Sequence, residues 1–185
     1  MPRGPDQRGG IKIMSKESIP HPADLAPEQL LEQCDIRFLR RSGPGGQHRN
    51  KVSTAVALLH RPTGIMAEAS ERRSQAENRC EAISRLRIHL ALQLRTRREA
   101  GNVPSTLWRS RSHEGRIEVS TTHDDFPALL AEALDVLAAS GNDPRLAGET
   151  LGCTATQLVK LLKKAPQALL QVNKERRKQG LHPLR

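Results

Sequence analysis

The stretch VSTAVALLHRPTGIMAEA, residues 52–69, decides the fold of this chain. Apolar and β-branched residues from 52 to 59 favour a strand. Pro62-Thr63-Gly64 is a turn signal, because proline presets φ and glycine accepts a positive φ. Apolar residues resume from Ile65 to Ala69, so the stretch predicts a hairpin of two antiparallel strands.

The segments on either side of the hairpin complete a small α+β domain, which we expect at residues 24–120. Upstream, Ile36 and Phe38 alternate with polar residues as in a half-buried strand, after a short helix capped by Asp24. Downstream, residues 74–98 predict one long helix packed across a small mixed or antiparallel sheet. Its expected apolar stripe comprises Ala76, Cys80, Ile83, Leu86, Leu90 and Leu94, and its opposite face carries Arg79, Arg85, Arg87, Arg95, Arg97 and Arg98. Residues 102–112 are predicted to be a loop, and Ile117 and Val119 an edge strand.

The two ends of the chain differ from this domain. Residues 1–23 are rich in glycine, proline and charge and predict a flexible N-terminal tail. Residues 121–185 predict a helical, basic C-terminal extension, with apolar residues at helical spacing from Phe126 onward. Within it, residues 146–162 fit either a helix-turn-helix with Gly152 at the turn or a plain helical hairpin, which we favour.

The composition narrows the class of partner. The chain carries 30 Lys and Arg against 20 Asp and Glu, a formal charge of +10, which favours a polyanion such as nucleic acid. Aromatic residues make up only 2%, so stacking of bases on aromatic side chains is not the expected mode of binding. Three widely separated cysteines predict neither a disulfide framework nor a metal site, as expected for a cytoplasmic protein. The sequence also lacks an apolar run that predicts a membrane span or a secretory signal.

A glycine-rich loop separates the first two predicted strands and reads Ser42-Gly43-Pro44-Gly45-Gly46-Gln47-His48. Its glycines allow the backbone to approach another surface closely. No Asp or Glu occurs between residues 36 and 67, although Arg and Lys are frequent there. The glycine pattern fits neither the P-loop nor the dinucleotide fingerprint. From these residues alone, the loop is either an uncharged tip for a phosphate-walled RNA pocket or a hairpin loop with incidental charge.

Several elements in register with this loop resemble the catalytic domain of bacterial-type class I peptide chain release factors. They are Gly45-Gly46-Gln47, Asn50-Lys51, Pro62-Thr63-Gly64 and Arg73-Ser74-Gln75-Ala76-Glu77-Asn78-Arg79, within a match over residues 30–95. The resemblance implies that the tip enters the ribosomal peptidyl transferase centre and promotes hydrolysis of the peptidyl-tRNA ester.

The resemblance also implies roles for individual residues. Gly45 and Gly46 would allow a tight backbone path, and the backbone N–H of Gln47 would stabilise developing negative charge. The Gln47 side chain is a candidate for methylation. No cofactor is expected, since ribosomal RNA and the substrate supply the remaining chemistry. The expected RNA contacts are Arg40, Arg41, His48, Arg49, Asn50, Lys51, Arg73 and Arg79.

Codon-reading members of the family carry further domains for the stop triplet. Only about 30 residues precede the match here, so we expect a short ribosome-rescue factor that acts without a stop codon. Its expected partners are large-subunit ribosomal RNA and P-site peptidyl-tRNA, with the protein acting as a monomer away from membranes. Basic residues of the extension are candidates for contact with small-subunit RNA or the messenger channel; they are Lys174, Arg176, Arg177 and Lys178. The alternative is a non-hydrolytic ribosome- or RNA-binding factor that retains the fold.

Overall fold

The computed structural model describes residues 12–13, 20–40 and 54–185. Its main sheet has three antiparallel strands in the order β2-β3-β4, with β2 at Cys34–Leu39, β3 at Ala55–His60 and β4 at Ile65–Ala69. The predicted hairpin is confirmed: β3 pairs with β4, and Gly64 between them has a φ of +71°. Phe38 is 51% exposed at the open end of β2, so this strand is half-buried as expected.

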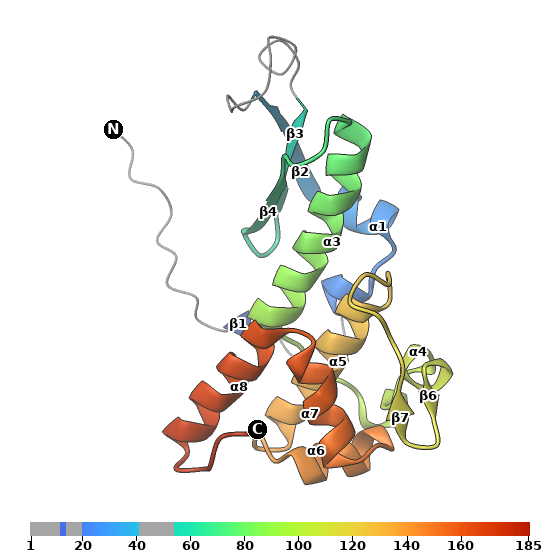
Figure 1. Cartoon of the computed structure of the whole chain (residues 1–185), viewed down its shortest axis with the longest axis vertical. Coiled ribbons are helices and arrows are strands. Elements are labelled where there is room, and N and C mark those ends of the chain that lie inside the picture. The colour runs from blue at the N-terminus through green and yellow to red at the C-terminus, as the bar shows by residue number, and fades with distance from the viewer. Residues whose placement is uncertain (1–11, 14–19, 41–53) are drawn as a thin grey trace.

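The long helix α3 (Gln75–Gln93) packs across this sheet, which confirms the predicted α+β fold (Figure 1). Ser74 caps it, and its hydroxyl accepts from the Glu77 N–H at 3.4 Å. The helix ends before the predicted Arg98 because Leu94 adopts an extended backbone. Leu94–Arg95 instead forms β5, which pairs in parallel with β1 (Lys12–Ile13).

The buried face of α3 differs from the predicted stripe. Ala76 and Cys80 are exposed, whereas Ala82, Leu86 and Leu90 are fully buried. The predicted arginine face is also partly wrong, because Arg87 and Arg95 are buried and Arg98 is half-buried. The physical reason is that α3 packs against the sheet on one side and against α5 on another. The buried part of its surface is therefore wider than a single apolar stripe.

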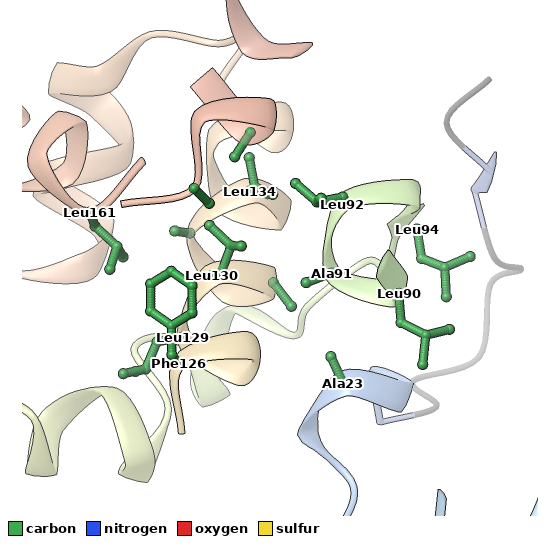
Figure 2. Close-up of a cluster of buried hydrophobic side chains, with 14 of the residues drawn as sticks. Ala23, Leu90, Ala91, Leu92, Leu94, Phe126, Leu129, Leu130, Leu134 and Leu161 are labelled. Atoms are coloured by element: carbon green, nitrogen blue, oxygen red, sulfur yellow. The ribbon is translucent and has the colours of Figure 1, made fainter. Parts of the chain in front are cut away.

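The chain from Phe126 onward is helical, as predicted, and forms α5 (Phe126–Ala139), α6 (Pro144–Leu151), α7 (Ala155–Lys163) and α8 (Pro166–Lys178). Helix α5 lies at the centre of the core, where Leu130 and Leu134 are surrounded by other apolar side chains (Figure 2). Because α3 and α5–α8 contribute to one buried cluster, the predicted boundary between residues 120 and 121 crosses a continuous core. That boundary stays a prediction.

The turn between α6 and α7 is tightly built. Gly152 ends α6 with a φ of +68°. A Cβ on Gly148 would lie 2.6 Å from the Cys153 carbonyl oxygen, so only glycine fits there. This geometry is compatible with both interpretations of residues 146–162, the helical hairpin and the helix-turn-helix.

Short elements surround this framework: η1 (Pro22–Asp24), α1 (Pro27–Glu32), η2 (Ala100–Asn102), α4 (Thr106–Ser110), β6 (Ser112–His113) and β7 (Arg116–Ile117). Two predictions need correction here. Ala26, not Asp24, is the N-cap residue of α1, and α4 lies inside the predicted loop because Ser105 caps it and Trp108 is buried. Ile117 is in a strand that pairs with β6, whereas Val119 is buried outside any strand. Among the helices described, none has the length and apolar character to cross a membrane.

Candidate functional site

The predicted catalytic residues Gly45, Gly46 and Gln47 lie outside the described residues, so their roles stay predictions. The same holds for the predicted RNA contacts Arg41, His48, Arg49, Asn50 and Lys51. The structure describes the residues on both sides of this segment. We call these residues the loop stem: Leu39 and Arg40 before the segment, and Thr54 and Ala55 after it.

The loop stem is held together by strand pairing. Leu39 at the end of β2 pairs with Ala55 at the start of β3. The chain therefore leaves and re-enters the sheet on adjacent strands, beside the N-terminal end of α3 (Figure 1). Val56, next along β3, is fully buried, so the stem continues directly into the core.

Asn78 in the first turn of α3 joins the stem to the segment that precedes the helix. Its side chain is fully buried. Its Nδ2 donates to the Thr54 carbonyl oxygen at 2.7 Å and to the Arg72 carbonyl oxygen at 2.9 Å. Its Oδ1 accepts from the Arg72 N–H at 2.9 Å. Asn78 lies in the motif at residues 73–79, but no sequence signal predicts a site role for it, because its burial depends on the two layers that cover α3 from distant parts of the chain.

Exposed arginines surround this end of the molecule. Arg40, Arg73 and Arg79, the predicted RNA contacts that the structure describes, all have exposed side chains. Arg37 and Arg72 are exposed as well and were missed as site candidates. Their shared position near the stem makes this a cationic surface, the feature that binding to an RNA backbone requires.

Two other arginines at the surface bind groups of the protein itself. Arg85 donates to the Glu71 carboxylate at 2.8 Å and to the Glu68 carbonyl oxygen at 2.9 Å. This hydrogen bond from Arg85 is the largest cause of the lowering of the Glu71 pKa to about 2. Arg61 donates to the Cys34 carbonyl oxygen at 2.9 Å and pairs with Asp35 at 3.1 Å. Both arginines fix loops at the edge of the sheet.

His60 is buried inside the same sheet. Its Nδ1 lies 2.7 Å from the Thr63 hydroxyl and its Nε2 lies 3.0 Å from Gln33 Oε1. Burial lowers the pKa of His60, and the Arg61 charge adds to this effect. The histidine is therefore neutral near pH 7 and holds the β3–β4 turn.

The predicted basic residues of the extension divide into two groups. Lys174, Arg177 and Lys178 are exposed on α8. Arg176 is half-buried; its Nε donates to the His182 carbonyl oxygen at 2.7 Å, and its Nη1 donates to the Asn142 carbonyl oxygen. Arg176 thus fixes α8 and the chain after it to the end of α5.

A groove of about 710 Å³ runs between α5, α8 and the chain at Arg95–Arg97. Leu134, Ala138 and Val172 provide its apolar lining. Arg97, Lys174 and Lys178 also line it, with Glu175 paired to Lys178 at 2.8 Å. The groove brings Arg97 together with basic residues of α8 that are distant in sequence, which no local pattern indicates.

No cluster of metal ligands occurs among the residues that the structure describes. Cys34 is buried, and its thiol donates to the Leu30 carbonyl oxygen at 3.1 Å. Burial raises the pKa of Cys153 to about 11.

Comparison with known proteins identifies the loop-bearing part of the chain. Residues 29–125 match the model of the RF-1 domain. Peptide chain release factor 1 of Delftia acidovorans is 44% identical over 72 residues, which are 38% of this chain and 20% of that protein. The chloroplastic peptide chain release factor PrfB1 of Arabidopsis thaliana is 40% identical over 90 residues, 49% of this chain and 16% of that protein.

Peptide chain release factor 1 of Leuconostoc citreum is 51% identical over 59 residues, 32% of this chain and 15% of that protein. The chain thus spans about a fifth of the length of the curated relatives it matches. The RF-1 domain match, by contrast, covers more than half of the 185 residues of the chain. The chain therefore belongs to the RF-1 domain family and contains the catalytic domain of class I peptide chain release factors.

Proposed function

We propose that this protein promotes hydrolysis of the peptidyl-tRNA ester in the ribosomal peptidyl transferase centre without reading a stop codon. The observation that carries the proposal is the family membership together with an intact Gly45-Gly46-Gln47 tip inside the matched region. A module that only binds RNA has no need of a neutral glutamine at the tip of a glycine loop.

The chemistry proposed for the tip needs no acid or base from the protein. The Gln47 backbone N–H donates to the oxygen on which negative charge develops, and the amide side chain admits water while excluding larger nucleophiles. Gly45 and Gly46 permit the backbone path that brings this N–H to the ester. Gln47 is also the candidate for methylation.

Two cationic surfaces support the ribosome as the partner. Arg40, Arg73 and Arg79 are exposed near the loop stem, where they can contact large-subunit RNA while the tip reaches the P-site peptidyl-tRNA. Lys174, Arg177 and Lys178 are exposed on α8, at the end of the molecule remote from the stem (Figure 1). We assign the second surface to small-subunit RNA or the messenger channel.

The test is release of labelled peptide from purified ribosomes that hold peptidyl-tRNA in the P site and have an empty A site. Three messengers are compared: one with a stop codon, one with a sense codon and one truncated after the P-site codon. We expect release with all three, and none from peptidyl-tRNA in free solution. Gly46→Ala is expected to slow release about 100-fold or more, the range for loss of one oxyanion donor.

The remaining outcomes separate the alternatives. Gly101→Ala serves as the matched control, because a Cβ there meets no atom within 4 Å. Binding to ribosomes without any release would support the second candidate, a non-hydrolytic ribosome- or RNA-binding factor. Release only with the stop codon would contradict codon independence and leave the hydrolytic role intact.

A further inference from the structure

We infer that Asn78 is a positioning residue for the glycine loop, which it serves by fixing the return point of the loop, Thr54, to the N-terminal turn of α3. This inference rests on the proposed function, because its consequence is a rate of peptide release. The observation behind it is a single buried amide that bonds two backbone segments distant in sequence.

The amide of Asn78 is nearly saturated by these bonds. A side-chain amide has two N–H donors and one carbonyl acceptor with two lone pairs. Here the donors reach Thr54 and Arg72, and the acceptor takes the Arg72 N–H. Because the side chain is fully buried, water cannot replace a lost bond at low cost.

The anchor itself is rigid. Asn78 lies in the first turn of α3, and its backbone N–H donates to the Ser74 carbonyl oxygen at 3.1 Å. One turn further on, Ala82 is fully buried against the rest of the core. A movement of Thr54 relative to this turn therefore requires breaking the hydrogen bond from Asn78 Nδ2 to the Thr54 carbonyl oxygen rather than moving the helix.

Both backbone partners of Asn78 are close in sequence to residues that the proposed function uses. Thr54 is the first described residue after the segment that contains the tip, so its position sets where that segment rejoins the sheet. Arg72 precedes Arg73, one of the expected RNA contacts. One side chain thus couples the exit of the loop to the cationic surface beside it. Displacements of about 1 Å can lower a catalysed rate about 100-fold, so this coupling bears on release.

The test replaces the amide with a side chain of the same shape. Asn78→Asp keeps an oxygen acceptor for the Arg72 N–H but loses both donors, and it places a carboxylate oxygen against the Thr54 carbonyl. The matched control is Asn173→Asp. Asn173 holds Leu184 by the same kind of pair, Nδ2 to the Leu184 carbonyl oxygen at 3.1 Å and the Leu184 N–H to Oδ1 at 2.7 Å, at the far end of the chain.

Two readouts separate positioning from general stability. The first is the single-turnover release rate as a function of factor concentration, measured below the melting temperature of each variant. For Asn78→Asp we expect at least about a tenfold lower rate at saturation with half-saturation changed less than about twofold, the signature of an interaction that acts in the transition state. For the control we expect a release rate at saturation within about twofold of wild type, which is the quantity that separates it from Asn78→Asp.

The second readout is hydrogen exchange of the backbone amides. Asn78→Asp is expected to accelerate exchange at residues 54–56 and 70–73 while amides in α5 keep wild-type protection. Should this variant fail to fold, Asn78→Ser, which is too short to reach both partners, is measured in the same two ways.

Wild-type release by a folded Asn78 variant would overturn the inference, as would a loss of release that the Asn173 control reproduces at equal melting temperature. Unchanged exchange at residues 54–56 would also overturn it. If the wild-type protein releases no peptide, the proposed function fails, whereas the exchange experiment still decides whether Asn78 holds the stem.

Discussion

At the scale of single residues, burial determines what a polar side chain of this protein does. His21 caps η1, where its Nδ1 accepts from the Ala23 N–H at 3.0 Å. It is 2% exposed, and burial followed by the nearby Arg98 charge lowers its pKa from 6.5 to about 3. Like His60, it is a buried polar side chain whose hydrogen bonds are made within the protein.

His21 predicts a pH dependence of stability. Its pKa is lower in the folded than in the unfolded protein, so the unfolded state takes up a proton first as the pH falls below 6.5. We expect the free energy of unfolding to fall between pH 6.5 and 5, with a contribution from His21 of up to about 1.4 kcal/mol per pH unit. Above pH 7.5 this contribution is constant.

The measurement is urea unfolding at a series of pH values for the wild type and for His21→Asn, which keeps a capping acceptor but does not titrate. The slope of the variant is expected to be lower by up to one proton. Part of the slope remains, because burial lowers the pKa of His60 as well. Equal slopes for both proteins would contradict the prediction.

At the scale of elements, α8 and a segment distant from it in sequence together line one groove. Gln171, Lys174 and Lys178 recur along one side of α8 and face the groove that Arg97 also lines. The Oε1 atom of Gln171 is buried and has no hydrogen-bond partner among the described residues. The cationic side chains that line the groove are suited to contact with a phosphate, whereas the Gln171 oxygen needs a hydrogen-bond donor.

The groove predicts that removing two positive charges from it weakens ribosome binding more than removing two positive charges from α7. Arg97→Ala/Lys174→Ala removes two exposed cations from the groove, and Lys160→Ala/Lys163→Ala removes two exposed cations from α7. For the groove variant we expect weaker binding to ribosomes, with a salt slope smaller by about one per residue. The measurement is ribosome affinity between low and physiological salt; the same loss in both variants would show that only total charge matters.

At the scale of the whole molecule, ion pairs connect η1 and the chain after α3 to α5. Arg98 pairs with Asp24 at 3.1 Å and with Asp135 at 3.0 Å, and Thr96 donates to the Asp135 carboxylate from its N–H at 3.0 Å and its hydroxyl at 2.7 Å. Glu132 accepts from the Ser105 hydroxyl at 2.6 Å. Residues of η1, the chain after α3, and α5 therefore share one polar network beside the common apolar core.

The network predicts that replacing Arg98 lowers the free energy of unfolding more than replacing Arg85, although the sequence places both arginines on the same predicted face of one helix. Arg98→Ala leaves the Asp135 side chain, 1% exposed, without its charge partner, and we expect a loss of about 3–5 kcal/mol in the free energy of unfolding. Arg85→Ala breaks a pair with Glu71, which is 55% exposed, and is expected to cost at most about 1 kcal/mol. Urea unfolding measures both, and similar losses would contradict the ranking.

The sequence by itself determined the local elements and the family. Turn chemistry at residues 62–64 and apolar runs on either side specify the hairpin, because these signals act between neighbours along the chain. The family follows from the resemblance of the Gly45-Gly46-Gln47 loop and its flanking motifs to release factors, which the RF-1 domain match confirms. Helical periodicity from Phe126 onward likewise predicts α5–α8. These inferences need only local propensity and pattern.

Only the tertiary structure decided which polar residues are exposed. On α3, Arg79 is exposed and Arg87 is buried, where its guanidinium donates to the Ala23 carbonyl oxygen at 2.9 Å and the Asp124 carbonyl oxygen at 2.7 Å. In the sequence Asn78 is an ordinary polar residue of the first helical turn, and only the structure brings the Thr54 and Arg72 backbones to its side chain. Burial depends on what covers a helix from distant parts of the chain, and a charged or amide side chain carries no periodic signal that reports its future partner.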